Sequence, residues 1–220
     1  MALVDFIGTV HGSTNRDYVA RVVEHDKAAC AAKAIEWEFD YWDGDRSTGY
    51  GGFHYDGRWR KVAAAMAKHY QLADDATILD VGCGKGFLLY EFTQVLPRCT
   101  VAGLDISSYA IEHAKPEISE YLRQGDASQL PYPDSSFDFV VSVTTLHNLL
   151  IGPMFAALSE IERVGRKAKH VTVESYRTEH EKVNLMYWQL TCRAFHKPDE
   201  WNWIFDKSGY TGDYGFIYFE

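Results

Sequence analysis

Three glycines and two acidic residues between positions 80 and 105 have the types and spacing of a ligand site. Gly82, Gly84 and Gly86 stand between an apolar run that predicts a buried strand and a run, 87–92, that predicts a helix. In such a turn a glycine adopts positive φ and lets the backbone approach a ligand, while free amides at the helix N-terminus face it. The turn therefore suits a bound ligand better than a packed side chain.

The next carboxylate along the chain indicates the kind of ligand. Asp105 ends a second apolar run, 99–105, at the distance from the turn at which an acid bonds ribose hydroxyls. Phe87 stands where the dinucleotide fingerprint G-x-G-x-x-G needs its third glycine, so NAD fits poorly. The charge of Asp105 would also repel a second phosphate. Turn and acid together predict a pocket for an adenosine-bearing cofactor.

The elements that must position these residues follow from the hydrophobic pattern. Strands are predicted near 77–82, 99–105 and 120–123, and at 137–143 and 170–174, with helices between them. A helix from Asp199 to Gly209 and a last strand, Tyr214 to Phe219, follow. This alternation predicts an α/β fold: a doubly wound, Rossmann-like, mostly parallel sheet of about six to seven strands with helices on both faces.

Four blocks of sequence resemble the class I S-adenosylmethionine-dependent methyltransferases, above all the branch of ubiquinone-biosynthesis-type and other small-molecule methyltransferases. They are 80–86, 103–107, 125–138 and 140–147. One glycine turn would be weak support, but four blocks in the family's order make accidental agreement improbable. The resemblance implies S-adenosylmethionine as cofactor, S-adenosylhomocysteine as its product and methyl transfer as the reaction.

The resemblance also implies roles for single residues at the turn. The glycines, with Cys83 among them, cradle the amino-acid part of the cofactor, and Asp80 lies near its ammonium group, usually through water. Asp105 holds both ribose hydroxyls, and Ile106 packs against adenine. Ile106 could equally be an ordinary core residue.

Three further residues are assigned to the cofactor in the same way. Asp126 matches the acid that accepts from the adenine amino group, and Ala127 supplies a backbone amide. Thr144, after the fourth strand, is placed in the same pocket. The alternative for Asp126 is a helix cap.

Candidate catalytic residues lie after the fourth and fifth strands. Methyl transfer needs alignment of the acceptor with the methyl group and sulfur, and removal of a proton where the acceptor has one to lose. His147 is the best candidate base by its place at the carboxyl edge and its ordinary pKa near ~6.5, although a purely structural histidine is the alternative. Glu174 and Tyr176 are further candidates for acceptor contact by position. Oxygen or nitrogen is the favoured acceptor atom.

Residues 1–70 predict a cap over the site. The stretch from Asn15 to Tyr41 has the mixed pattern of a surface helix, and 60–70 resumes helical spacing. Between them, 41–59 has the glycines, aromatics and charges of a binding loop, or of an Ω-loop packed by its own aromatics. By analogy with related enzymes, Tyr50, Tyr55 and Arg58 are expected to contact cofactor or substrate, whereas Arg58 could instead pair with Asp45 or Asp56.

An insertion, 176–198, follows the fifth strand. A helix over 183–192 is expected to dock by a face spaced i, i+3, i+4, i+7, which comprises Val183, Met186, Tyr187 and Leu190. Aromatic side chains of this insertion are expected to wall an acceptor pocket and to offer cation–π contact to the sulfonium; they are Tyr187, Trp188 and Phe195.

Composition predicts one catalytic domain. The 220 residues, 46% of them hydrophobic, suffice for a single domain with a cap at 1–70, a cofactor-binding core at 71–175 and, at 176–220, a lid helix, the last helix and a closing strand. Family members usually close the sheet with two strands here, and this chain offers one. The sheet could therefore have only six strands, or a partner chain could supply the missing edge strand, as in a homodimer.

Charge and cysteine usage exclude other classes. A net charge of −9 without a Lys/Arg-rich run argues against a nucleic-acid substrate. The sequence shows no secretory leader, no membrane-spanning stretch and no C-x-x-C pair among its four cysteines, which predicts a reduced, cytoplasmic protein. Histidine spacing implies no metal.

The leading interpretation is therefore a methyltransferase with a small-molecule acceptor. Two alternatives belong to other classes: a methyltransferase that acts on a protein or RNA, and a non-methylating protein that binds the same cofactor. The intact ribose acid, Asp105, argues against the last.

Overall fold

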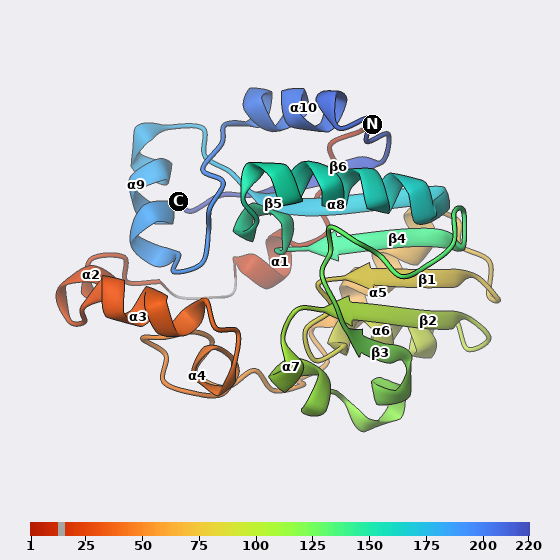
Figure 1. Cartoon of the computed structure of the whole chain (residues 1–220), viewed down its shortest axis with the longest axis horizontal. Helices are drawn as coiled ribbons and strands as arrows, with labels where there is room; N and C mark the ends of the chain where they lie inside the picture. Colours follow the sequence, from red (N-terminus) through yellow and green to blue (C-terminus); the bar gives the residue numbers. More distant parts are fainter. Residues whose placement is uncertain (13–15) are drawn as a thin grey trace.

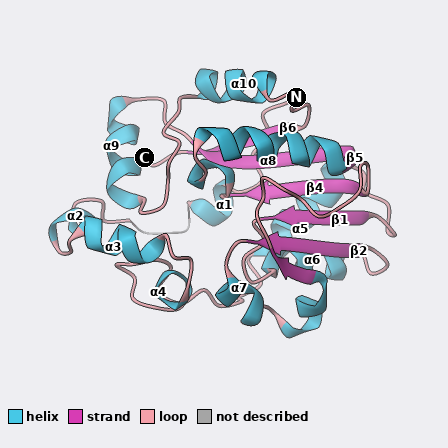
Figure 2. Ribbon diagram, in the orientation of Figure 1, coloured by secondary structure: helices cyan, strands magenta, loops and turns pink. Residues whose placement is uncertain are grey.

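The computed structural model describes residues 1–12 and 16–220. Within them, six parallel strands form one sheet in the order β3-β2-β1-β4-β5-β6 (Figures 1 and 2). Their bounds are β1 Thr77–Val81, β2 Thr100–Asp105, β3 Leu122–Gln124, β4 Phe137–Val143, β5 Gly165–Glu174 and β6 Asp213–Ile217. The predicted doubly wound α/β fold is confirmed.

Helices cover both faces of the sheet. Figure 1 shows α8 in front of it and α5 and α6 behind it, and α10 shares the hydrophobic cluster of α8. The helices are α1 Gly8–His11, α2 Ala20–Val23, α3 Lys27–Ala34, α4 Phe39–Trp42, α5 Trp59–His69, α6 Phe87–Val95, α7 Ser108–Glu112, α8 Ile151–Val164, α9 Glu179–Trp188 and α10 Pro198–Lys207, with short 3₁₀ helices η1 Pro116–Tyr121 and η2 Leu146–Asn148.

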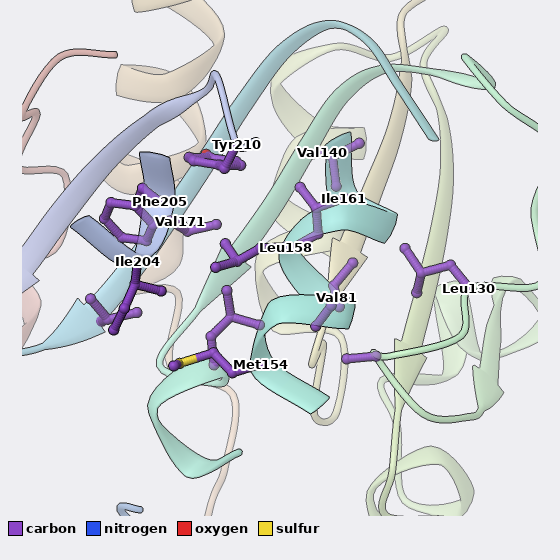
Figure 3. Packing of buried hydrophobic residues seen from close by; sticks show 14 of the residues in the cluster. Val81, Leu130, Val140, Met154, Leu158, Ile161, Val171, Ile204, Phe205 and Tyr210 are labelled. Atoms are coloured by element: carbon purple, nitrogen blue, oxygen red, sulfur yellow. The ribbon is translucent and has the colours of Figure 1, made fainter. Parts of the chain in front are cut away.

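Two hydrophobic clusters hold the layers together. Because successive strand residues point to opposite faces, Val140 packs with α8 and α10 (Figure 3), whereas its neighbours Phe139 and Val141 pack with α5 and α6. All residues of β4 are buried. A strand covered on both faces has a continuous apolar pattern, which is why 137–143 could be predicted to the residue.

The order of the strands reverses between β1 and β4. The chain leaves β1 into α6 on one face and leaves β4, through η2, into α8 on the other. A crevice opens at such a point beyond the carboxyl ends of the strands. In Figure 2 the strand arrows point toward this side, where α2, α3, α4 and α9 lie.

The edge beside β6 resolves the question of the seventh strand. In the described residues the sheet has six strands, and β6 pairs directly with β5. Its outer side is covered by Ala2–Val4: Val4 N–H donates to Tyr214 O at 2.8 Å, and Tyr214 N–H donates to Ala2 O at 3.0 Å.

The helix expected from Asn15 to Tyr41 is wrong as a continuous element. Asn15 itself lies outside the described residues, and the rest forms α2, α3 and α4. Asp26 restarts the helix because its carboxylate accepts from the N–H groups of Ala28 and Ala29, as an N-cap does. Trp37, at φ 58°, then interrupts it before α4.

The insertion forms a helix, α9, but its expected docking face is wrong. Val183, Met186 and Tyr187 are 42%, 48% and 38% exposed, and Leu190 is half-buried. The buried side consists of Glu181, Asn184 and Leu185. Polar contacts permit this burial, because Asn184 Nδ2 donates to Phe219 O at 3.0 Å and Glu181 accepts from the backbone N–H and guanidinium of Arg177.

Candidate active site

The turn between β1 and α6 requires glycine, first at Gly82 and Gly84. Gly82 has φ 83° and Gly84 has φ 52°, in the region that side chains disfavour. A Cβ on Gly82 would overlap Thr145 Oγ1, and one on Gly84 would lie 2.9 Å from the ring of Trp42. The turn is thus closely approached from the β4 side and from α4 of the cap.

Asp105, at the end of β2, is bonded to the same turn. Its Oδ2 accepts from Gly84 N–H at 2.7 Å and its Oδ1 from Ser107 N–H at 2.9 Å. Burial raises the pKa of Asp105, and backbone donors, including Ser107 and Gly84, oppose that shift. Each carboxylate oxygen has a second lone pair, so both can still accept from a ligand hydroxyl.

Asp80, at the end of β1, is a buried acid whose Oδ1 has no hydrogen-bond partner among the described residues. Burial, and then the charge of Asp105, raise the pKa of Asp80 to about 8. An unpaired buried carboxylate is costly unless a donor or a cation reaches it. The arrangement fits S-adenosylmethionine, which carries an ammonium group and a sulfonium.

These residues surround a cavity of about 230 Å³, here called the turn cavity. Aromatic side chains of the cap also line it, namely Trp37, Tyr41, Trp42, Phe53 and Trp59. Most of the predicted cofactor residues line it, namely Tyr50, Asp80, Gly82, Cys83, Gly84, Asp105, Ile106, Asp126, Ala127 and Thr144.

Three predicted cofactor residues lie outside the lining of the turn cavity. Gly86, at φ 76°, is the N-cap before α6, and a Cβ there would overlap Ile118, so this glycine serves helix packing. Tyr55 donates its hydroxyl to Glu91. Arg58 forms an exposed ion pair with Asp56 at 2.6 Å and lines a second cavity.

Asp126 and Ile106, the residues predicted to contact adenine, both line the turn cavity. Asp126 Oδ1 accepts from the backbone N–H of Ser128 at 2.8 Å and from its hydroxyl at 2.7 Å. The carboxylate therefore caps a turn while it lines the cavity. Ile106 is 52% exposed beside it, as a side chain that offers an apolar surface to a ring would be.

A second, larger cavity of about 460 Å³ adjoins the first. It is called the arginine cavity here, because Arg16, Arg21, Arg46 and Arg58 line it. The two cavities share wall residues, which are Tyr41, Tyr50, Phe53, Trp59, Phe87, Thr144 and Asn148.

Glu174 and His147 line the arginine cavity as a buried pair. His147 Nδ1 accepts from the backbone N–H of Glu174 at 3.3 Å, which leaves the ring proton on Nε2, 3.3 Å from Glu174 Oε2. Gln189 Nε2 donates to the other carboxylate oxygen, Oε1. Burial lowers the pKa of His147 to about 3 and raises the pKa of Glu174 to about 8. At neutral pH the imidazole of His147 is therefore neutral. The carboxyl group of Glu174 can gain or lose a proton near this pH.

Thr144, which lines both cavities, has φ 57°. A β-branched residue rarely adopts that conformation, and such strain gathers where function requires a fixed geometry. Its N–H donates to Thr172 O at 3.0 Å, and Asn148 Nδ2 donates to its carbonyl at 3.1 Å. These bonds hold the strained residue between the two cavities.

The aromatic predictions for the acceptor wall are only partly supported. Trp188 lines the arginine cavity, whereas Tyr187 and Phe195 line neither cavity. The prediction that Tyr176 contacts the acceptor needs correction as well. The ring of Tyr176 is buried in the cluster on the α5–α6 face, because the chain has already left β5 and turned away from the cavities.

Sequence reasoning missed the residues that fasten the cap. Lys85, within the glycine turn, is buried and pairs with Asp43 at 2.6 Å. Burial alone would raise the pKa of Asp43, but bonds from Lys85, the Phe53 N–H and Tyr109 hold it below the usual range. Trp42 Nε1 also donates to Ser107 Oγ at 2.9 Å.

Aromatic contacts cover the turn next to this ion pair. Trp42 stacks on Tyr50, and Phe53 stacks on Phe87 of α6, with ring centroids 5.6 and 5.0 Å apart. Segment 41–59 is therefore packed by its own aromatics, as an Ω-loop is, and it also lines both cavities, while its ligand role stays a prediction. Its dense tryptophan and tyrosine content was the signal available in the sequence.

Two searches of the described residues bear on other classes. None of their helices combines the length and apolarity needed to cross a membrane. No cluster of three or more His, Cys, Asp or Glu side chains in this part of the chain is arranged to hold a metal ion.

Comparison with known proteins identifies the class. Residues 72–209 match the family described as methyltransferase domain, and the chain belongs to this family. This agrees with the class I S-adenosylmethionine-dependent methyltransferase family that the four sequence blocks resemble. The match contains every strand of the sheet except β6 and all four predicted sequence blocks.

Two curated relatives illustrate the range of acceptors. A demethylmenaquinone methyltransferase from Symbiobacterium thermophilum is 35% identical over 49% of this chain and 45% of its own length. A tRNA (carboxymethyluridine(34)-5-O)-methyltransferase from Arabidopsis thaliana is 31% identical over 59% of this chain and 30% of its own. The chain thus spans less than half the length of either relative.

A solved structure shares the fold. The YcgJ protein from Bacillus subtilis superposes with a TM-score of 0.53 at 22% identity, over 66% of each chain.

Proposed function

We propose that the protein transfers the methyl group of S-adenosylmethionine to a small-molecule acceptor held in the arginine cavity. The observation that carries the proposal is the pair of adjoining cavities: one is lined by the cofactor motif, the other by a buried proton acceptor, and both share Thr144. A cavity of about 460 Å³ has the size of a small-molecule site.

In this proposal the residues of the turn cavity hold the cofactor. Asp105 accepts from the ribose hydroxyls, Asp126 and Ile106 contact adenine, and Asp80 accepts from the ammonium group. When bound, the cofactor supplies an electrophilic methyl group on a sulfonium. Residues 1–70 act as a cap whose aromatic side chains exclude water from both cavities.

Glu174 is the general base of the proposed reaction, and His147 positions it. The protonated Nε2 lies 3.3 Å from Glu174 Oε2, and Nδ1 already accepts from a backbone N–H, so the ring has no lone pair left for an acceptor proton. Glu174 lines the cavity and has a pKa near neutrality, which suits the removal of a proton from a hydroxyl or ammonium group.

An acceptor of low molecular mass is favoured over RNA or protein. The arginine cavity is walled by the cap, by Trp188 to Thr191 and by Phe219, and the chain as a whole carries −9 charges. All four cysteines are free thiols, which agrees with the proposed cytoplasmic location.

Calorimetric titration with S-adenosylmethionine, S-adenosylhomocysteine and NAD tests the proposal. The first two should bind and NAD should not, and Asp105→Ala should weaken both by about tenfold or more because the ribose loses its charged acceptor. Asp74→Ala, an acid paired with Arg98 and not in either cavity lining, is the matched control and should bind normally.

Methyl transfer itself is followed with methyl-labelled cofactor in a cell extract separated into small molecules, RNA and protein. Label in the small-molecule fraction supports the proposal. Label confined to RNA or protein, or equal binding by Asp105→Ala and wild type, contradicts it.

A further inference from the structure

Three arginines surround one indole in the wall of the arginine cavity. The guanidinium carbons of Arg16, Arg21 and Arg46 lie 5.4, 5.2 and 5.2 Å from the ring centroid of Trp188, the last residue of α9. All four side chains line the cavity. Guanidinium groups on an aromatic face are held in place by cation–π attraction, which fixes their positions without neutralising their charge.

Two arginines of this cluster, Arg21 and Arg46, form no ion pair with an acid among the described residues. Within the described residues, no carboxylate oxygen lies within 4.0 Å of a guanidinium nitrogen of Arg21 or Arg46. Of the acids that line the cavity, Asp56 is paired with Arg58, and Glu174 faces His147 and Gln189. Burial, followed by the charge of Arg46, lowers the pKa of Arg21.

Backbone carbonyls orient the guanidinium groups of Arg21 and Arg46, and some N–H donors of both groups have no acceptor among the described residues. Arg46 Nη1 donates to Tyr50 O at 2.9 Å, and Arg21 donates through Nε to Trp188 O at 3.3 Å and through Nη1 to Arg46 O. Arg21 Nη2 and the Nε and Nη2 of Arg46 have no acceptor among the described residues. An arginine fixed in this way is prepared to bind a carboxylate or phosphate with paired hydrogen bonds.

We propose that the methyl acceptor is a small organic anion, whose carboxylate or phosphate is bound by Arg21 and Arg46 beside Trp188 and whose hydroxyl faces Glu174. This inference rests on the proposed function. Local positive charge in a chain of net charge −9 selects an anion at the cavity while the remaining surface repels it.

The proposed step balances without a further reactant. The hydroxyl oxygen forms a bond to the methyl carbon, and the carbon–sulfur bond breaks with its electron pair on sulfur. The hydroxyl proton passes to the Glu174 carboxylate. The products are a methyl ether that keeps its acidic group and S-adenosylhomocysteine.

The melting temperature of the protein saturated with S-adenosylhomocysteine, measured with small probes, tests the inference. Inorganic phosphate and glycolate represent the two acidic groups, glycolamide is the neutral isostere of glycolate, and sodium chloride matches ionic strength. At several times its dissociation constant, at least one anion should raise the melting temperature by about 2 to 4 °C more than chloride or glycolamide. The larger of the two anion shifts identifies the acidic group.

Two variants locate the effect. Arg21→Gln and Arg46→Gln should each lose most of the anion shift, whereas Arg98→Gln, an exposed arginine outside both cavities, should keep it. Arg46 is exposed, so Arg46→Gln and the charge-retaining Arg46→Lys leave the core intact, and Arg46→Lys should keep part of the shift.

The outcomes separate this inference from the proposed function. If wild type binds S-adenosylhomocysteine but neither anion exceeds chloride, the anionic acceptor is wrong and the methyltransferase proposal stands. An anion shift that survives in both glutamine variants overturns the arginine site equally. If S-adenosylhomocysteine does not bind wild type, the proposed function itself fails.

Discussion

Glu174 and Asp80 are buried carboxyl groups with similar pKa values and different surroundings. Burial raises the pKa of both to about 8. Asp80 Oδ1 lacks a donor in the turn cavity, whereas in the arginine cavity Glu174 accepts from Gln189 through Oε1 and has Oε2 3.3 Å from His147 Nε2. In the proposed function, these different surroundings assign Asp80 to cofactor binding and Glu174 to proton transfer.

Glu174→Gln should lower kcat by about 10² to 10⁴, because a general base contributes that much, with little change in S-adenosylhomocysteine affinity. Only the carboxylate accepts a proton, so wild-type kcat should rise with pH and level off above the Glu174 pKa of about 8. The variant should lose this rise. Turnover from pH 6 to 9, with calorimetry on both proteins, provides the measurement.

His147→Gln serves as the companion variant. If His147 positions Glu174, this variant should be slower but should keep the rise of kcat with pH. A pH rise that disappears with His147→Gln and survives Glu174→Gln would assign the base to His147 instead.

At the scale of single residues, the sequence could predict that Asp80 and Asp105 meet at the glycine turn, but not the state of the histidine. Asp80 and Asp105 end predicted strands, and strand ends meet at one edge of a parallel sheet. The proton position on His147 depends on a backbone N–H from β5, 27 residues further along the chain. No local pattern carries that information.

At the scale of elements, the cap is fastened to the glycine turn by one buried ion pair. Lys85 and Asp43 have side chains only 5% and 17% exposed, and Asp43 also binds the Phe53 N–H and Tyr109. The two residues lie 42 positions apart, so neither periodicity nor composition linked them. The aromatic content of segment 41–59 was visible in the sequence, but the ion pair that attaches this segment to the turn was not.

Asp43→Asn should destabilise the protein by about 3 kcal/mol, because it leaves the Lys85 ammonium buried without a charged partner. S-adenosylhomocysteine affinity should fall with it, since Trp42 and Phe53 line the turn cavity. Urea unfolding and calorimetry measure the two effects. Asp74→Asn breaks the exposed pair with Arg98 and should cost less than about 1 kcal/mol; equal losses from both variants would contradict the role of the buried pair.

The insertion shows where an apolar pattern misleads. Spacing favoured Val183, Met186 and Tyr187 as the docked face of α9, yet the helix buries Glu181 and Asn184 beside Leu185. Polar side chains can occupy a buried face when each finds a partner, and here the partners are Arg177 and the Phe219 carbonyl. These partners come from outside the helix, so its own sequence does not reveal them.

At the scale of the whole molecule, the sheet ends differently on its two sides. β3 is a short strand, and short edge strands are weak templates for pairing. β6 has its outer side covered by Ala2–Val4, and Ala2 N–H also donates to the Asp213 carboxylate at 2.6 Å. A strand count could be predicted from the sequence, but this pairing joins residues more than 200 positions apart.

Val4→Pro should expose the edge of β6 by removing the Val4 N–H that donates to Tyr214 O, a loss of about 1 kcal/mol in folding stability. An uncovered edge pairs with other chains, so the mean mass in solution should increase with concentration more steeply than in wild type. Light scattering after size exclusion measures this. Leu3→Pro is the matched control, because the bonds to Tyr214 come from Ala2 O and Val4 N, on either side of Leu3. If both variants retain the wild-type mass at every concentration, residues 2–4 do not protect this edge. If both variants associate, the cause is a proline in this segment and not the loss of the Val4 hydrogen bond.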